Sequence, residues 1–430
     1  MVRVFAVALA WVLAAELTAP VAPVPIVGGT PTESCGWPSV VWADGCSGTL
    51  IHPELVLYAA HCGTPQTVYL GPRVDGDEGR VVPVAECRTF PGGGVPGMGN
   101  DFGWCRLAVP QLDVPIVPPL VGCETDALVA DAAVTLVGFG LDDDDVLGTK
   151  RAVATRVLDL VGPEVQIGGM GADTCTGDSG GPALLRLPDG QWRLAGVTSY
   201  GAADCGEGGF YARVDNGLAW VEQTSGLDVT PCTDAEGTWS PDARCVGVPI
   251  EPQLGTGIWE EGCRGGPVSG PVDTCGEAIA APTDLTAPTL VLASPGDGET
   301  FVVSSAEETV DVVATVEATD DGAVRYVVLD IDGPGGPSSL DLSQDASANV
   351  VMAVGTYVLS ARAVDEAGNV AISETVTVTV EVDEGGCRCR TRGGPEGRAG
   401  WWLVLLGLRP RRRRGRSPGS APTSARPRGP

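Results

Sequence analysis

The stretch TCTGDSGGPALL at residues 174–185 places Ser179 between an aspartate and two glycines. A serine hydroxyl is a weak nucleophile unless a neighbouring base accepts its proton. The chain has 2 histidines, and His61 is the candidate base because it lies in the sequence AAHC, directly after the apolar run LVLY. This pattern predicts a strand end and a tight turn pinned by a cysteine, which would hold the imidazole rigidly.

A histidine that acts as a base also needs a carboxylate to orient its ring. Asp101 is the candidate because it opens the otherwise apolar segment DFGWCRLAV, whereas many other acids of the chain suit an exposed surface. Each residue alone has a plainer explanation, since Ser179 could be a turn serine and His61 a structural histidine. The three residues together indicate nucleophilic catalysis.

The elements that must position these residues are strands. Val-rich alternating runs such as VYLGPRV, AVTLVGFG and ETVTVTVEV recur along the chain, and the 61 glycines and 35 prolines provide many turns. No segment has the pattern of a long amphipathic helix. The sequence therefore predicts an all-β protein.

Four short motifs then occur in one order: IVGG at 26–29, AAHC at 59–62, NDFGWCRL at 100–107 and GDSGGP at 177–182, and TSYG follows at 198–201. In this order and spacing they make residues 26–226, about half of the chain, resemble the chymotrypsin/trypsin family of serine proteases. The resemblance implies two six-stranded antiparallel β-barrels with a catalytic cleft between them. It also implies that the enzyme hydrolyses peptide bonds through an acyl-enzyme, without a metal ion or an organic cofactor.

The resemblance gives each candidate residue a role. Ser179 would attack the scissile carbonyl, His61 would transfer the proton, and Asp101 would orient the imidazole and stabilise its charged form. The backbone N–H groups of Gly177 and Ser179 would bind the oxyanion of the tetrahedral intermediate.

Specificity can also be transferred from the family. Asp173, six residues before Ser179, matches the floor of the primary pocket, where an acid selects protein or peptide substrates with Arg or Lys at the cleaved bond. An ordinary loop acid is the alternative. The rest of the substrate site would be formed by Ser199, Tyr200, Gly201 and Gly209, with Tyr200 in place of the family's tryptophan.

Activation in this family requires a new chain start at Ile26, whose α-amino group would pair with Asp178 and order the oxyanion loop. The residue before Ile26 is Pro25, not Arg or Lys, so a trypsin-like activator would not cut there. We expect a proline-directed or dipeptide-trimming enzyme, or another route, to remove the prosegment at residues 20–25.

The 14 cysteines fit an exported protein in an oxidising compartment. The family resemblance implies the disulfides Cys46–Cys62 and Cys175–Cys205 and suggests Cys87–Cys105. Subtraction then leaves Cys35 to pair with Cys123. In the loop at 141–152, the Lys150–Arg151 pair would be a point of self-cleavage if the enzyme cuts after basic residues.

The two ends of the chain have the composition of targeting signals. Residues 1–19 combine one arginine, a short apolar run and small residues, as in a secretory signal peptide. Residues 385–430 combine a Cys-x-Cys pair, an apolar run and an arginine cluster, and they resemble C-terminal sorting signals of Gram-negative bacteria, particularly the myxobacterial type. The resemblance implies a transient membrane contact of the tail and retention of the secreted protein at the outer cell surface, although a solvated basic tail is the alternative.

Two further segments lie between the predicted protease domain and the tail. Residues 227–282 are rich in Gly and Pro and contain four cysteines, which predicts a disulfide-stapled linker; a zinc site is the less favoured alternative because no histidine is near. Residues 283–384 contain strands at sandwich spacing, and ARAVDEAGNV at 361–370 resembles bacterial immunoglobulin-like and fibronectin-like repeats. Four acids of this part could bind calcium or be solvated turn residues: Asp320, Asp321, Asp330 and Asp365.

The formal charge of −28 argues against nucleic acid as a partner. The sequence as a whole leaves three functions open. The first is a surface endopeptidase. The second is a non-catalytic adhesion or binding protein on a protease scaffold. In the third, the sandwich part holds a polysaccharide or a protein, and the protease only processes its carrier.

Overall fold

The computed structural model describes residues 26–141, 146–202, 205–234, 237–242, 244–245, 247–259, 262–269, 272–277, 284, 286–365 and 367–383. The predicted signal peptide (1–19), prosegment (20–25) and sorting signal (385–430) lie outside these residues, as do four aspartates of the loop at 141–152. Within the described residues, no helix has the length and the apolar character that a membrane span requires.

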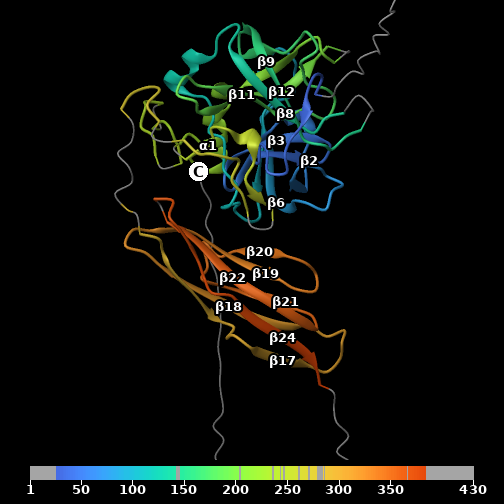
Figure 1. Cartoon of the computed structure of the whole chain (residues 1–430), viewed down its shortest axis with the longest axis vertical. Coiled ribbons are helices and arrows are strands. Elements are labelled where there is room, and N and C mark those ends of the chain that lie inside the picture. Colours follow the sequence, from blue (N-terminus) through green and yellow to red (C-terminus); the bar gives the residue numbers. More distant parts are fainter. Residues whose placement is uncertain are drawn as a thin grey trace, which may run out of the picture. The chain divides into compact units, whose positions relative to one another are not determined.

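Two antiparallel β-barrels occupy the first half of the chain, as the sequence predicts (Figure 1). The first barrel closes in the order β2-β3-β4-β7-β6-β5. Its strands are β2 (Val40–Ala43), β3 (Cys46–His52), β4 (Leu55–Tyr58), β5 (Thr67–Leu70), β6 (Arg80–Thr89) and β7 (Gly103–Leu107).

The second barrel follows the order β9-β10-β13-β12-β11-β8 and closes through pairing of β8 with β9, while β1 (Thr30–Pro31) is added beside β9. Its strands are β8 (Ala133–Gly138), β9 (Arg151–Val161), β10 (Glu164–Ile167), β11 (Pro182–Arg186), β12 (Trp192–Gly201) and β13 (Gly209–Arg213). Short helical turns η2 (Gly122–Ala127) and η3 (Val214–Asn216) and one α-helix, α1 (Leu218–Ser225), complete this part.

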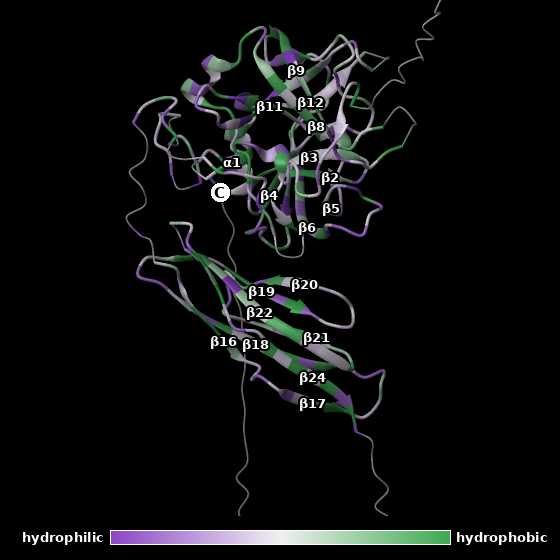
Figure 2. Ribbon diagram, in the orientation of Figure 1, coloured by the Kyte–Doolittle hydropathy of each residue, from purple (hydrophilic) through white to green (hydrophobic). Residues whose placement is uncertain are grey.

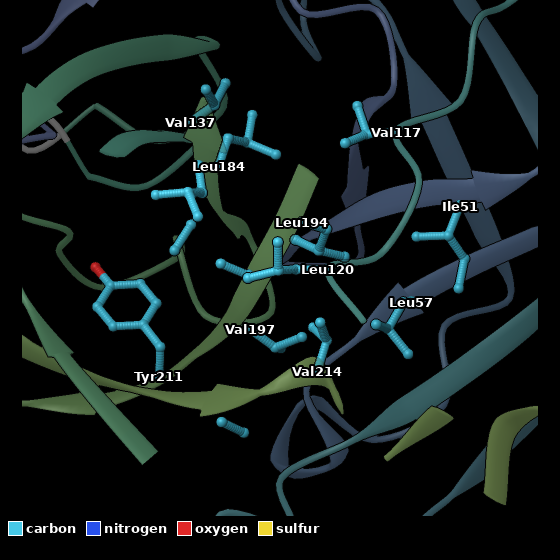
Figure 3. Packing of buried hydrophobic residues seen from close by; sticks show 14 of the residues in the cluster. Ile51, Leu57, Val117, Leu120, Val137, Leu184, Leu194, Val197, Tyr211 and Val214 are labelled. Atoms are coloured by element: carbon cyan, nitrogen blue, oxygen red, sulfur yellow. The ribbon is translucent and has the colours of Figure 1, made fainter. Parts of the chain in front are cut away.

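Some strands are apolar at every position because their two faces are buried in two different hydrophobic clusters. Leu55 and Leu57 of β4 belong to a cluster shared with the second barrel, whereas Val56 between them belongs to a second cluster inside the first barrel. Figure 2 shows the resulting hydrophobic stretches along the strands of both barrels. In Figure 3, Ile51 and Leu57 of the first barrel lie in the same packed layer as residues of the second. This layer positions the facing loops of the two barrels.

The cysteine-rich segment is fastened to the barrels. Three predicted disulfides are present: Cys46–Cys62, Cys87–Cys105 and Cys175–Cys205. The predicted pair Cys35–Cys123 is wrong. Cys35 is bonded to Cys263 and Cys123 to Cys275, and only Cys232–Cys245 closes within the segment.

The physical reason for this pairing is that the segment packs on the barrels. Trp259 is buried in the cluster inside the first barrel, and its indole N–H donates to the Ser34 carbonyl at 3.0 Å. The backbone N–H of Trp37 donates to the Pro252 carbonyl at 2.9 Å. The segment contributes η4 (Pro252–Leu254) and the small ladder of β14 (Gly257–Ile258) with β15 (Gly262–Cys263). All four of its cysteines are in disulfides, which leaves no thiolate for the alternative zinc site.

The later residues form two sheets around a hydrophobic cluster of their own. One sheet contains β16 (Thr289–Ser294), β18 (Val310–Thr319) and β21 (Ser347–Met352). The other has the order β17-β24-β22-β19-β20, with β23 beside β22. Its strands are β17 (Glu299–Val303), β19 (Val324–Asp332), β20 (Ser338–Asp341), β22 (Gly355–Asp365), β23 (Val370–Ile372) and β24 (Val376–Val382).

Candidate active site

The predicted base and carboxylate meet at the end of β4. The chain leaves this strand through the single turn η1 (Ala60–Cys62), which the Cys46–Cys62 disulfide ties to β3. His61 Nδ1 lies 2.6 Å from Asp101 Oδ2, and the backbone N–H of His61 donates to Asp101 Oδ1 at 3.0 Å. The carboxylate therefore holds both the ring and the backbone of the histidine.

Asp101 is only 2% exposed. Burial by itself would raise its pKa, but hydrogen bonds from His61 and Ser199 outweigh burial and hold the pKa of Asp101 below its ordinary value. The Ser199 hydroxyl donates to Asp101 Oδ2 at 2.6 Å. The carboxylate is consequently ionised at neutral pH, the state in which it can stabilise an imidazolium. The sequence placed Ser199 in the substrate site and gave no signal for this contact.

Ser179 lies at the junction of the two barrels. Its carbonyl accepts from the Ser47 N–H of β3 at 2.8 Å, and the Gly180 N–H donates to the Thr198 carbonyl of β12 at 2.8 Å. Cys62 Sγ is 3.8 Å from the Ser179 carbonyl oxygen, so the serine backbone adjoins the turn that carries His61. Among the described residues, the Ser179 hydroxyl makes no hydrogen bond, and nucleophile–base contacts are often long in free enzymes.

The backbone around Ser179 fits an anion site. Gly177 has a φ of +97°, and a Cβ there would lie 2.5 Å from Leu147 Cδ1, so only glycine suits this turn. The Ser47 hydroxyl donates to the Gly177 carbonyl at 3.1 Å and fixes the orientation of the loop. Within the described part of the chain, the N–H groups of Gly177 and Ser179 donate to no protein acceptor. Both are therefore available to an oxyanion.

Asp173 is buried beside several glycines. Its carboxylate is 3% exposed and accepts from the N–H groups of Thr174 and Gly208, each at 2.8 Å. Burial raises its pKa, against the effect of these backbone hydrogen bonds. No cationic side chain of the described residues pairs with it. Gly201 and Gly209 are cross-strand partners, and a Cβ on Gly209 would lie 3.6 Å from Asp173 Oδ1.

Gly168, beside Asp173, was not predicted, whereas Tyr200 was expected in the substrate site. A Cβ on Gly168 would lie 2.7 Å from Asp173 Oδ1, so a larger residue would crowd the carboxylate. Tyr200 stacks on Phe210 with ring centroids 4.9 Å apart, and its hydroxyl donates to Glu164 Oε2 at 2.8 Å. Burial and the Glu164 carboxylate raise the pKa of Tyr200 to about 12, so the hydroxyl stays protonated.

Ile26 and Asp178 are both buried. The Asp178 carboxylate accepts from the N–H groups of Gly140 and Cys175, at 2.7 and 2.9 Å, and has no cationic partner among the described residues. Burial raises its pKa to about 7. Nearby, the Asp173 N–H donates to the carbonyl of Val27, the residue after Ile26, at 3.1 Å. Val27 thus lies beside the loop that carries Asp173.

The four acids predicted as possible calcium ligands do not all lie together in the structure. Carboxylate oxygens of Asp284, Asp320 and Asp365 lie within 4.8 Å of one another. Asp330 is not part of this group, because its carboxylate pairs with Arg362 Nε at 2.6 Å. Asp321 is exposed.

Comparisons with known proteins agree with this geometry. The family described as Trypsin matches residues 26–221. Among curated proteins, transmembrane protease serine 9 of Rattus norvegicus is 29% identical over 229 residues, which cover 46% of this chain and 22% of that protein. The chain thus matches about a fifth of the length of this relative.

Proposed function

We propose that this chain is an endopeptidase that cleaves peptide bonds after arginine or lysine, because its residues 26–221 match the family described as Trypsin. The His61–Asp101 pair at 2.6 Å carries the catalytic part of the proposal. It fixes Nδ1 on the carboxylate and leaves Nε2 as the ring atom that can accept a proton.

The reaction follows from this arrangement. His61 Nε2 takes the proton of the Ser179 hydroxyl as the oxygen attacks the scissile carbonyl, and the imidazolium that forms is stabilised by ionised Asp101. The N–H groups of Gly177 and Ser179 bind the oxyanion. His61 then protonates the leaving amine, and a water molecule releases the acyl group by the same route in reverse.

The buried carboxylate of Asp173 supports the preference for Arg and Lys. A buried anion without a cationic partner gains most from a substrate guanidinium or ammonium group. The glycines at 168, 201 and 209 leave room for such a long side chain. An apolar substrate side chain would leave the carboxylate buried and unpaired, which is unfavourable.

Activation is proposed to depend on a new α-amino group at Ile26. The Asp178 carboxylate is buried and pairs with no cation of the described residues, and an ammonium group beside it would compensate the charge and order the Gly177 loop. The enzyme that removes the residues up to Pro25 would be proline-directed or dipeptide-trimming.

We place the protein outside the cytoplasm, on the basis of the six disulfides among the described residues and the signal-like residues 1–19. Residues 227–282 would be a stapled linker, residues 283–384 an immunoglobulin-like module, and residues 385–430 a sorting signal that retains the protein at the cell surface. Mass spectrometry of the mature protein would test these boundaries through both chain ends.

The test of the proposed function uses protein shown by mass spectrometry to start at Ile26. We expect it to hydrolyse an arginyl tetrapeptide amide, and Ser179→Ala to reduce kcat by roughly 10⁵-fold or more. Asp173→Ser should lower kcat/KM for the arginyl substrate by about 100-fold or more while sparing a phenylalanyl analogue. Absence of Ser179-dependent hydrolysis would favour the non-catalytic binding protein.

A further inference from the structure

Glu164, the first residue of β10, is a buried acid that the reaction itself does not use. It is 2% exposed, and no cationic side chain of the described residues pairs with it. Its carboxylate accepts three hydrogen bonds: Oε1 from the N–H groups of Gly97 and Gly99, at 2.9 and 3.1 Å, and Oε2 from the Tyr200 hydroxyl at 2.8 Å. Burying a carboxylate is unfavourable unless such bonds are made.

The first partner is the loop at 91–99, which leads to Asp101. It is rich in glycine and has no strand or helix, and Val95 and Met98 point side chains into solvent, 50% and 59% exposed. The loop packs closely at two of its glycines, since an added Cβ would lie 2.8 Å from Ala60 Cβ at Gly93 and 2.4 Å from Pro163 Cβ at Gly99. It also touches the base, because a Cβ on Gly94 would lie 3.1 Å from His61 Cβ. The bonds to Glu164 add to these contacts in holding the loop against His61.

The second partner, Tyr200, lies in β12 of the second barrel. It stands between Ser199, which bonds Asp101, and Gly201, which faces Gly209 above the pocket floor. The Glu164 carboxylate therefore joins two segments that flank the site, one beside His61 and one beside the primary pocket. A peptide bound with its basic side chain at Asp173 would carry its neighbouring residues past these segments.

We propose that Glu164 is a positioning residue that holds the loop at 91–99 and Tyr200 as two walls of a groove for extended peptide substrates. The inference rests on the proposed protease function. Glu164 should therefore affect long and short substrates differently. It contributes to binding of the substrate residues next to the basic residue at Asp173, and contributes much less to hydrolysis of a substrate with a single residue.

The test compares kcat/KM for an arginyl tetrapeptide amide with kcat/KM for a single-residue arginyl amide. In Glu164→Ala we expect the ratio of the two to fall about tenfold or more, mainly through a higher KM for the tetrapeptide, since charge-assisted hydrogen bonds are lost. Glu164→Gln should recover part of the ratio, because its amide oxygen can still accept from the loop. Tyr200→Phe, which removes one donor, should lower the ratio less than Glu164→Ala.

Glu124→Gln is the matched control. Glu124 is a buried acid of the same domain that pairs with Arg193 at 2.9 Å, so its loss tests a merely structural effect. It should leave the ratio unchanged even if the protein melts at a lower temperature. If Glu164→Ala, Glu164→Gln and Tyr200→Phe all kept the wild-type ratio of the two kcat/KM values, the inference would be overturned and the protease function would stay intact. Failure of the wild type to cleave either substrate would overturn both.

Discussion

At the scale of single residues, the proposed catalytic carboxylate, Asp101, is bonded by a neighbour outside the three proposed catalytic side chains. Asp101 accepts from the ring and the backbone of His61 and from the Ser199 hydroxyl. The serine hydroxyl and the imidazole share Oδ2, so the hydroxyl helps to keep this oxygen negative and the ring in one orientation. Ser199 therefore acts on the reaction through Asp101.

Ser199→Ala should lower kcat about tenfold and change KM little, because one hydrogen bond to a charged group is worth roughly 1.5–3 kcal/mol and part of it is recovered by relaxation. Steady-state kinetics on the arginyl tetrapeptide amide would measure this. Ser339→Ala serves as the control, since its hydroxyl donates to Asp330 in β19 at 2.7 Å. A variant of Ser199 with wild-type kcat would contradict the role given to this hydroxyl.

Lys150 overturns one expectation from the sequence. The Lys150–Arg151 bond was expected to be a self-cleavage point, but Lys150 is fully buried in the folded protein. Its ammonium lies over the rings of Phe139 and Trp259, at 5.4 and 5.7 Å, and donates to the Trp37 carbonyl at 3.1 Å. The bond is thus protected while the fold is intact.

Lys150 should make stability depend on pH. Burial lowers its pKa from 10.5 to about 7. Protonation of Lys150 therefore favours the unfolded chain. The buried ammonium lowers the free energy of unfolding by its full amount below about pH 7, and this destabilisation disappears as pH rises toward 10.5. Lys150→Met should raise the free energy of unfolding by roughly 3 kcal/mol at pH 6 and by much less at pH 10.

Urea denaturation at both pH values would measure the effect of Lys150→Met. Arg156→Met, at an exposed position of β9, is the control and should show no such pH dependence. Equal gains for Lys150→Met at pH 6 and pH 10 would argue against a buried ammonium.

At the scale of elements, the sequence predicted the strands because their patterns are local. The run LVLY became β4, and the alternating ETVTVTVEV became β24. The partners of Cys35 and Cys123 could not be predicted in this way. They lie 228 and 152 residues away, and a pairing over such a distance depends on where the intervening chain packs.

The residues of the candidate site also differ in whether a local sequence pattern could predict them. His61 and Asp101 lie in short motifs, so their pairing could be expected from a family resemblance. Glu164 could not, because nothing in the sequence EVQI says that the first residue of this strand points at a glycine-rich loop 65 residues earlier. Such contacts depend on the folded backbone alone.

The disulfides of residues 227–282 should differ in their contribution to stability. The bond Cys35–Cys263 closes a loop of 228 residues and Cys232–Cys245 one of 13. In the chain-entropy account, longer loops constrain the unfolded state more. The double variant Cys35→Ala, Cys263→Ala should lose about 2 kcal/mol more unfolding free energy than Cys232→Ala, Cys245→Ala. A larger loss for the short loop, measured by urea denaturation, would contradict this account.

At the scale of the whole molecule, the charge is distributed unevenly. The chain has 27 basic and 55 acidic residues, and residues 387–430 hold 12 arginines and one acid. The preceding residues therefore carry 15 basic and 54 acidic side chains, a balance of −39. A body of this charge attracts cationic peptides, and salt screens the attraction over about 10 Å at 0.1 M.

This charge should make the protease sensitive to salt in a way that depends on its substrate. For a peptide with several basic residues outside the cleaved position, kcat/KM should fall about threefold or more between roughly 20 mM and 500 mM salt, because the long-range attraction is screened. A peptide with acidic residues at those positions should gain over the same range, since its repulsion is screened too. Both peptides keep the same arginine at the cleaved bond, so the contact with buried Asp173 cancels in the comparison. An identical salt response of the two peptides would mean that the surface charge serves solubility alone and takes no part in substrate capture.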